Sequence, residues 1–156
     1  LLGPLTNPAN AKYQLLGVFH KKWVKIHCEV LKDLGSKHAM VVHGEDGLDE
    51  ISLSDVTNIA ELKNGIIKEF VFNPQDYNYK LIKNSDILGG DSEYNARKLI
   101  EMLDGSNIKF QHIVELNAGA ALYLGGVSKN LKEGFELSKH VIESKKSKKF
   151  LEKLIN

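Results

Sequence analysis

Short apolar runs and a segment of helical spacing occupy the first third of the chain. Residues 13–19 form a short apolar run that suits a buried strand. Residues 38–43 are apolar inside and β-branched at Val41 and Val42, which is typical of strands buried on both faces. Between them, the apolar positions of residues 21–34 recur with helical spacing, and Gly35 follows as a helix end. A strand, a helix and a strand in this order predict a βαβ unit with parallel strands.

The middle of the chain predicts a loop and then a hairpin. Residues 44–50 are acidic and glycine-bearing, and we expect them at the carboxyl end of the second strand. Residues 51–62 and 66–72 predict two further strands with a turn at 63–65, because Asn-Gly is a strong hairpin signal. Residues 73–90 are rich in turn formers and predict little regular structure.

The last third of the chain predicts helices. Asp91, Asn107 and Asn130 each precede a segment of helical spacing, where their side chains can cap the helix N-terminus. Small side chains at residues 117–122 predict that another backbone approaches closely, and residues 150–155 belong to a final helix. We therefore expect a helical C-terminal third.

Composition adds the fold class and limits the partners. The 156 residues are 42% hydrophobic and 26% charged, as in one ordinary globular domain. With the pattern above, they predict an α/β domain over residues 1–156, a largely parallel sheet flanked by helices. The 21 basic and 20 acidic residues leave a net charge of +1. A protein that binds nucleic acid without sequence preference needs a basic surplus, so we expect no nucleic-acid partner.

Cysteine use and hydropathy bear on the compartment. Cys28 is the only cysteine, which excludes an intrachain disulfide and a cysteine-based zinc cage and is compatible with a reducing compartment. Its place on the apolar side of the first helix predicts a core thiol. The sequence has no apolar run long enough to cross a bilayer and no signal-peptide pattern. We expect a cytoplasmic protein without a membrane partner.

The acidic loop is the best candidate for chemistry. It carries four carboxylates, and in open α/β sheets ligands bind beyond the carboxyl ends of the strands. On a loop, the adjacent Asp49 and Glu50 can converge on one hard cation, and Mg²⁺ prefers such oxygen ligands. The alternative is an acidic surface turn with no ligand.

Other candidate residues are weaker. The six histidines show no metal-ligand spacing, and His43, the one beside the acidic loop, is interpreted as structural. Gly89 and Gly90 precede a helix and could bring backbone amides to a phosphate, but an ordinary connector is the better interpretation.

Four motifs occur in the order of a known family. They are Leu2-Gly3-Pro4-Leu5-Thr6-Asn7-Pro8-Ala9, Gly47-Leu48-Asp49-Glu50, Gly89-Gly90-Asp91 with Asn95-Ala96, and the run from Asn117-Ala118 to Tyr123. Over essentially its whole length the chain resembles the anthranilate phosphoribosyltransferases, of the nucleoside phosphorylase/phosphoribosyltransferase family. It departs from the family at Glu93-Tyr94-Asn95-Ala96, where a second acidic residue more often precedes the asparagine.

The resemblance implies an activity and site residues. These enzymes of tryptophan biosynthesis join 5-phosphoribosyl 1-diphosphate to anthranilate and release pyrophosphate, with Mg²⁺. By match of motif, Asp49 and Glu50 would be the magnesium ligands, and Gly3 and Pro4 would lie at the anthranilate channel. No residue of this chain needs to be a covalent nucleophile.

The resemblance also implies what the chain leaves out. The family's glycine-rich phosphate loop, its Lys-His-Gly-Asn segment and its anthranilate-binding arginine normally precede this region. The chain opens at Leu1 without an initiator Met. We expect the C-terminal α/β portion of the enzyme, inactive alone and mostly without the N-terminal helical domain through which the family forms homodimers.

Two other functions stay open at this point. A pyrimidine nucleoside phosphorylase-like enzyme would use phosphate as nucleophile, and the Gly47-Leu48-Asp49-Glu50 motif argues against it because a phosphorylase need not bind magnesium diphosphate. A non-catalytic nucleic-acid-binding paralogue would favour a basic surface, which a nearly neutral chain does not suggest. The sequence leaves open a fusion to a glutamine amidotransferase.

Overall fold

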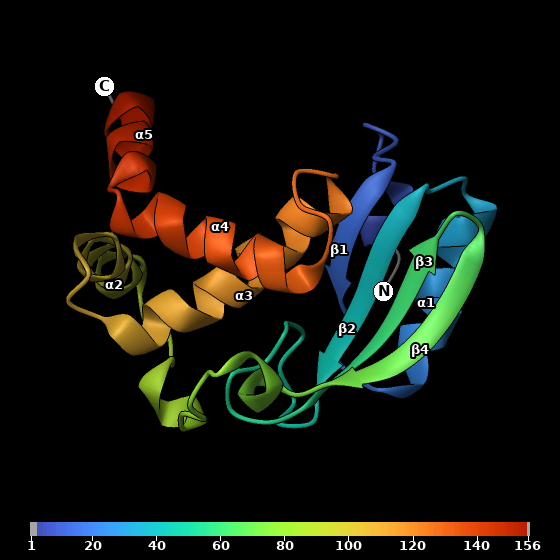
Figure 1. The fold of residues 1–156 in the computed structure, drawn as a ribbon, viewed down its shortest axis with the longest axis horizontal. Coiled ribbons are helices and arrows are strands. Elements are labelled where there is room, and N and C mark those ends of the chain that lie inside the picture. Colours follow the sequence, from blue (N-terminus) through green and yellow to red (C-terminus); the bar gives the residue numbers. More distant parts are fainter. Residues whose placement is uncertain (1–2, 156) are drawn as a thin grey trace.

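The computed structural model describes residues 3–155, which form a four-stranded sheet and five α-helices (Figure 1). A single 3-10 turn, η1 (Gly3–Thr6), comes first. Leu2, the first residue of the opening motif, lies outside the described residues. The α/β class expected from the sequence is confirmed.

The sheet begins with the predicted βαβ unit. Its strands are β1 (Tyr13–Gly17), β2 (His38–Gly44), β3 (Thr57–Lys63) and β4 (Ile66–Phe72), in the spatial order β1-β2-β3-β4. β1 and β2 pair in parallel, and α1 (Lys22–Asp33) connects them. The first two strands and their helix are therefore confirmed.

The sheet is mixed, which corrects the expectation of a largely parallel one. Only the β1–β2 pairing is parallel, whereas β2–β3 and β3–β4 are antiparallel. Residues 45–56 contain no crossover helix, so the chain returns beside β2 in the opposite direction. The hairpin then turns back at Asn64 and Gly65, which adopt φ angles of 52° and 77°.

The strand predicted from residue 51 starts only at Thr57. The hydroxyl oxygen of Ser52 accepts hydrogen bonds from the backbone N–H groups of Ser54 and Asp55, at 2.8 and 3.2 Å. The Thr57 hydroxyl accepts one from the Ser52 N–H at 2.9 Å. These side chains satisfy backbone groups that a strand would pair with its neighbour, so residues 51–56 remain a loop.

Two cores lie on the two faces of the sheet. Every residue of β2 is buried, and its side chains alternate between the faces, which explains its unbroken apolar run. Val41 packs with Cys28 and Leu31 of α1 on one face. On the other face, Met40 and Val42 belong to the core built with α3 (Ile108–Leu124) and α4 (Leu131–Glu143).

The remaining elements form the helical part, drawn to the left of the sheet in Figure 1. Two 3-10 turns, η2 (Pro74–Tyr77) and η3 (Asn84–Asp86), lead into α2 (Ser92–Asp104), and α5 (Lys146–Ile155) ends the fold. No helix among the described residues has the length and apolar character needed to cross a membrane.

The predicted helix caps and the close backbone approach are confirmed. The side chains of Asp91, Asn107 and Asn130 each accept a hydrogen bond from a backbone N–H in the first helical turn. A Cβ added to Gly119 of α3 would lie 2.7 Å from the backbone nitrogen of Phe135 on α4. A side chain at that position would therefore push the two helices apart.

Candidate functional site

The acidic loop begins where β2 ends and is fixed by its own backbone. The N–H of Gly44 donates to the Leu48 carbonyl at 2.8 Å, and the N–H of Glu45 donates to the Val56 carbonyl at 2.9 Å. The carboxylate of Asp46 accepts a further bond from the Leu48 N–H at 3.2 Å. These bonds close the loop on itself at the carboxyl end of the strand, where the sequence placed it.

Two of the four carboxylates, those of Glu45 and Asp46, accept hydrogen bonds that hold the loop in place. An oxygen of Glu45 accepts from the Lys21 ammonium at 2.7 Å and from the Asn58 amide at 2.8 Å, and both bonds lower the pKa of Glu45, Lys21 the more strongly. Asp46 accepts from the Ser52 hydroxyl at 2.6 Å. The protein itself supplies donors to both groups, so they are structural.

The other two carboxylates, on Asp49 and Glu50, are free. Both residues are exposed, and no side chain or backbone group in residues 3–155 forms a hydrogen bond or ion pair with either carboxylate. Burial of the protein-facing side of Glu50 raises its pKa, and the neighbouring Asp49 charge raises it further. A cation at this position would offset both effects.

A cavity of about 430 Å³ lies beside this pair. Its walls are apolar side chains of the sheet and of α3, among them Leu15, Val42 and Ile113. Asp49 and Glu50 line it as its acidic part. An apolar pocket with a few polar groups is the usual form of a small-molecule site.

Asn117 is a residue of this site that sequence reasoning did not single out. It lines the same cavity from α3, and its side-chain amide bonds to the backbone of Ile51, directly after Glu50. The sequence carried only an indirect signal, since Asn117 begins the last of the family motifs.

Gly3 and Pro4 begin the 3-10 turn η1, and no cavity beside Asp49 and Glu50 includes them among the described residues. Their turn, η1, packs through Leu5 against the core on the α1 side. Leu5 and Gln14 line a separate cavity of about 260 Å³, whereas the next residue of β1, Leu15, faces the cavity of Asp49 and Glu50. Asp49 and Glu50 thus line one cavity together, and the roles of these two residues and of Gly3 and Pro4 all stay predictions.

The weaker candidates have structural partners. The ring of His43 is buried, with its Nδ1 atom 2.8 Å from the Val18 carbonyl oxygen. The backbone N–H and C=O of Gly90 both bond to the side chain of Asn95, at 2.8 and 2.9 Å, so this amide does not point to a free phosphate site. Burial raises the pKa of the Cys28 thiol to about 11, as expected for a core thiol.

Clusters of three or more His, Cys, Asp or Glu side chains able to hold a metal are absent from residues 3–155. Any cation at Asp49 and Glu50 therefore needs further ligands, such as water or a substrate.

Sequence comparison finds one family over most of the chain. Residues 1–148 match the a/b domain of the glycosyl transferase family. The anthranilate phosphoribosyltransferase of Laribacter hongkongensis is 46% identical over 155 residues, which are 99% of this chain and 45% of that protein. The enzyme of the same name from Marinomonas sp. is 50% identical over 144 residues, which are 91% of this chain and 42% of that protein. The chain spans slightly less than half the length of these curated relatives.

Solved structures show the same fold. Anthranilate phosphoribosyltransferase from Thermus thermophilus superimposes with a TM-score of 0.86 at 35% identity, covering 97% of this chain and 45% of that one. The Saccharomyces cerevisiae enzyme in complex with PRPP and Mg gives a TM-score of 0.83 at 25% identity, covering 97% of this chain and 44% of that one.

Proposed function

We propose that this chain forms the metal-binding part of an anthranilate phosphoribosyltransferase. The chain belongs to the glycosyl transferase family, whose a/b domain matches residues 1–148. The observation that carries this proposal is the pair Asp49–Glu50. Both carboxylates lie after the carboxyl end of β2, at the position of the family motif, and neither has a bonding partner among residues 3–155. The relatives named for this activity support the choice of substrates.

The residues present fit Mg²⁺ chemically. The site offers hard oxygen donors, and each carboxylate is close enough to the other for Asp49 to raise the pKa of Glu50. Asp49 and Glu50 would hold the ion together with water and the diphosphate of the substrate. When bound, the ion neutralises charge on the leaving pyrophosphate.

The chain's own part in the reaction is binding and orientation. The bond from the ribosyl anomeric carbon to the diphosphate oxygen breaks, pyrophosphate leaves with that electron pair, and the anthranilate nitrogen bonds to the same carbon and loses a proton. Asp49 and Glu50 would hold the ion at the diphosphate end of the substrate, and Leu15, Val42 and Ile113 form an apolar wall beside them. No covalent intermediate with this chain is required.

The test uses the enzyme that contains this chain, assayed by the loss of anthranilate fluorescence while Mg²⁺ is titrated. We expect Asp49→Asn and Glu50→Gln each to lower kcat about 10²–10³-fold and to raise the Mg²⁺ requirement. Glu45→Gln is the matched control, because Glu45 lies on the same loop but bonds to Lys21 and Asn58. Unchanged magnesium titrations for both site variants would remove the metal assignment.

Three finer assignments belong to the same proposal. Gly3 and Pro4 contribute to the anthranilate channel, so Pro4→Ala is expected to raise the KM for anthranilate more than that for 5-phosphoribosyl 1-diphosphate. The enzyme acts as a homodimer in the cytoplasm, where the single buried thiol of Cys28 stays reduced. Turnover of a pyrimidine nucleoside with phosphate, in place of anthranilate, would favour the phosphorylase alternative.

A further inference from the structure

Two consecutive peptide groups flank Glu50, and a different element holds each of them. The first joins Asp49 to Glu50, and its carbonyl lies against Gly17 at the end of β1. A Cβ added at Gly17 would overlap the carbonyl oxygen of Asp49. The strand therefore accommodates the loop only because residue 17 has no side chain.

The second peptide group joins Glu50 to Ile51, and Asn117 of α3 holds it. The Asn117 side chain accepts from the Ile51 N–H at 2.9 Å and donates to the Ile51 carbonyl at 3.0 Å. Its second amide hydrogen serves the Ile113 carbonyl, also at 3.0 Å. Asn117 thus bonds to both the N–H and the C=O of Ile51, as a residue of a neighbouring strand would. Ile51 is 0% exposed.

The peptide groups on either side of Glu50 determine the direction of the two carboxylates. The side chains of Asp49 and Glu50 bond to nothing else in residues 3–155, so their direction depends on the peptide groups that carry them. Residues that orient metal ligands affect metal affinity although they do not touch the metal.

We propose that Asn117 is a positioning residue for the metal ligands, which it aligns by fixing the Glu50–Ile51 peptide group, with Gly17 as its counterpart on β1. The inference rests on the proposed function in one respect, the presence of a divalent cation at Asp49 and Glu50. It adds to that function Asn117, a residue 66 positions after Ile51 in the sequence.

The chain offers a matched control for this role. Asn95 makes the same two-sided pairing with Gly90, accepting from its N–H at 2.8 Å and donating to its carbonyl at 2.9 Å. Asn95 and Gly90 are exposed and do not line the cavity of Asp49 and Glu50. Asn95→Ala therefore removes the same kind of contact from a different part of the fold.

The experiment compares Asn117→Ala and Asn95→Ala in the enzyme that contains this chain. Binding of Mn²⁺ in the presence of 5-phosphoribosyl 1-diphosphate is measured by electron paramagnetic resonance, and the rate is measured against Mg²⁺ concentration. We expect Asn117→Ala to weaken Mn²⁺ binding about 10-fold or more and to raise the half-saturating Mg²⁺ concentration to match. We expect Asn95→Ala to change both by less than about twofold. Exchange of the Ile51 amide hydrogen should be faster in Asn117→Ala alone.

A purely structural role predicts a different result. In that case both variants would lower the urea midpoint of unfolding, and the Mn²⁺ affinity of Asn117→Ala would equal that of Asn95→Ala, which overturns the proposal. If Asn117→Ala does not fold, Asn117→Ser replaces it, since a shorter hydroxyl cannot pair with both sides of Ile51, and the same shift is expected.

The proposed function and the positioning role of Asn117 can be refuted separately. An enzyme that binds Mn²⁺ through Asp49 and Glu50 but does not consume anthranilate refutes the proposed function, and the Mn²⁺ affinities still decide the role of Asn117. An enzyme that consumes anthranilate, with a metal affinity indifferent to Asn117, keeps its function and loses the positioning residue. An enzyme whose Mn²⁺ binding does not depend on Asp49 and Glu50 refutes the positioning role as well.

Discussion

Residues of α3 line two cavities, and the carboxylates beside these two cavities are in opposite situations. Beside one cavity, Glu50 is exposed, and no group in the described part of the chain bonds to it. Beside the other, Glu115 of α3 is 0% exposed, and it accepts from the Gln111 amide at 2.7 Å and the Tyr79 hydroxyl at 3.3 Å. The cavity beside Glu115 has a volume of about 360 Å³.

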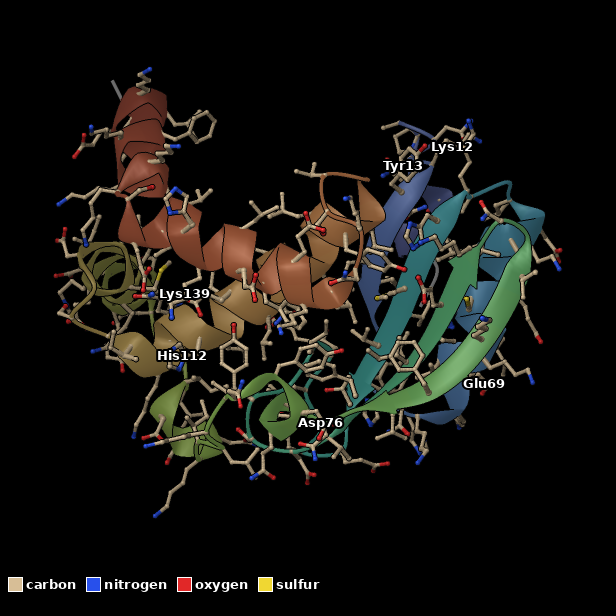
Figure 2. The ribbon with its side chains drawn as sticks, in the orientation of Figure 1. Lys12, Tyr13, Glu69, Asp76, His112 and Lys139 are labelled. Atoms are coloured by element: carbon tan, nitrogen blue, oxygen red, sulfur yellow. The ribbon has the colours of Figure 1, made fainter. Side chains whose placement is uncertain are left out.

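The surroundings of Glu115 look more like a binding site at first sight. Figure 2 shows Asp76, His112 and Lys139 around this region, and all three line the cavity beside Glu115. Yet the donors that reach the Glu115 carboxylate come from the protein and are neutral. A buried carboxylate whose two oxygens each accept a hydrogen bond from the protein contributes to the fold. The carboxylate without protein donors is the one available to a ligand, so the distribution of hydrogen bonds separates the two roles better than burial does.

The largest expected effect concerns the chain by itself. Two carboxylates supply few of the six ligands that Mg²⁺ prefers, so we expect the 156 residues alone to bind Mg²⁺ weakly and to show no turnover. In the family that the chain resembles, the phosphate loop precedes this region, and we expect a chain tested without that loop to lose positioning worth about 7–11 kcal/mol of the barrier. The measurement is anthranilate fluorescence with excess 5-phosphoribosyl 1-diphosphate and Mg²⁺. Turnover by the pure chain that Asp49→Asn abolishes would show that the active site is complete within these residues.

The sequence predicted the elements whose signals are local. The Asn-Gly turn, the caps at Asp91, Asn107 and Asn130, and the βαβ unit each depend on a few neighbouring residues, and all are present. The direction of β3 was missed because pairing with β2 is a contact between distant segments.

The candidate site shows the same division. The adjacent carboxylates of Asp49 and Glu50 could be selected from the sequence by their chemistry and motif. That Glu45 is occupied depends on Lys21 and Asn58, 24 and 13 positions away, and no spacing rule connects these residues. The pairing of Asn117 with Ile51 spans 66 positions and likewise needed the fold.

A pair of substitutions tests the comparison directly. We expect Glu115→Ala to lower the free energy of unfolding by about 2–4 kcal/mol, because it opens a void and leaves buried donors on Gln111 and Tyr79 unpaired. Glu50→Ala should change it by less than about 0.5 kcal/mol, since the side chain is exposed and bonds to no group within residues 3–155.

Urea unfolding and magnesium titration of the same two variants provide the readouts. We expect Glu115→Ala to lower the free energy of unfolding and to keep a normal magnesium requirement once folded. We expect Glu50→Ala to keep the free energy of unfolding and to raise the magnesium requirement. A magnesium requirement that rises in Glu115→Ala would show that the buried carboxylate takes part in the site after all.

A smaller loss of stability than that of Glu115→Ala is expected when the weaker of the two donors to Glu115 is removed. Tyr79→Phe removes one hydroxyl that donates at 3.3 Å, so we expect a loss of about 1 kcal/mol at pH 7.

Burial raises the pKa of Tyr79, and the nearby Glu115 raises it further. The unfolded chain therefore releases the Tyr79 proton at a lower pH than the folded chain does, and the wild type loses stability as the pH rises above about 10. Tyr79→Phe lacks this ionisation, so its deficit should shrink between about pH 10 and pH 11. Urea unfolding at pH 7 and across that range is the measurement, and Tyr13→Phe is the control, because Tyr13 lies exposed at the start of β1 (Figure 2). A deficit for Tyr79→Phe that stays constant with pH would mean that the hydroxyl is not held in the buried, neutral contact with Glu115 on which the comparison depends.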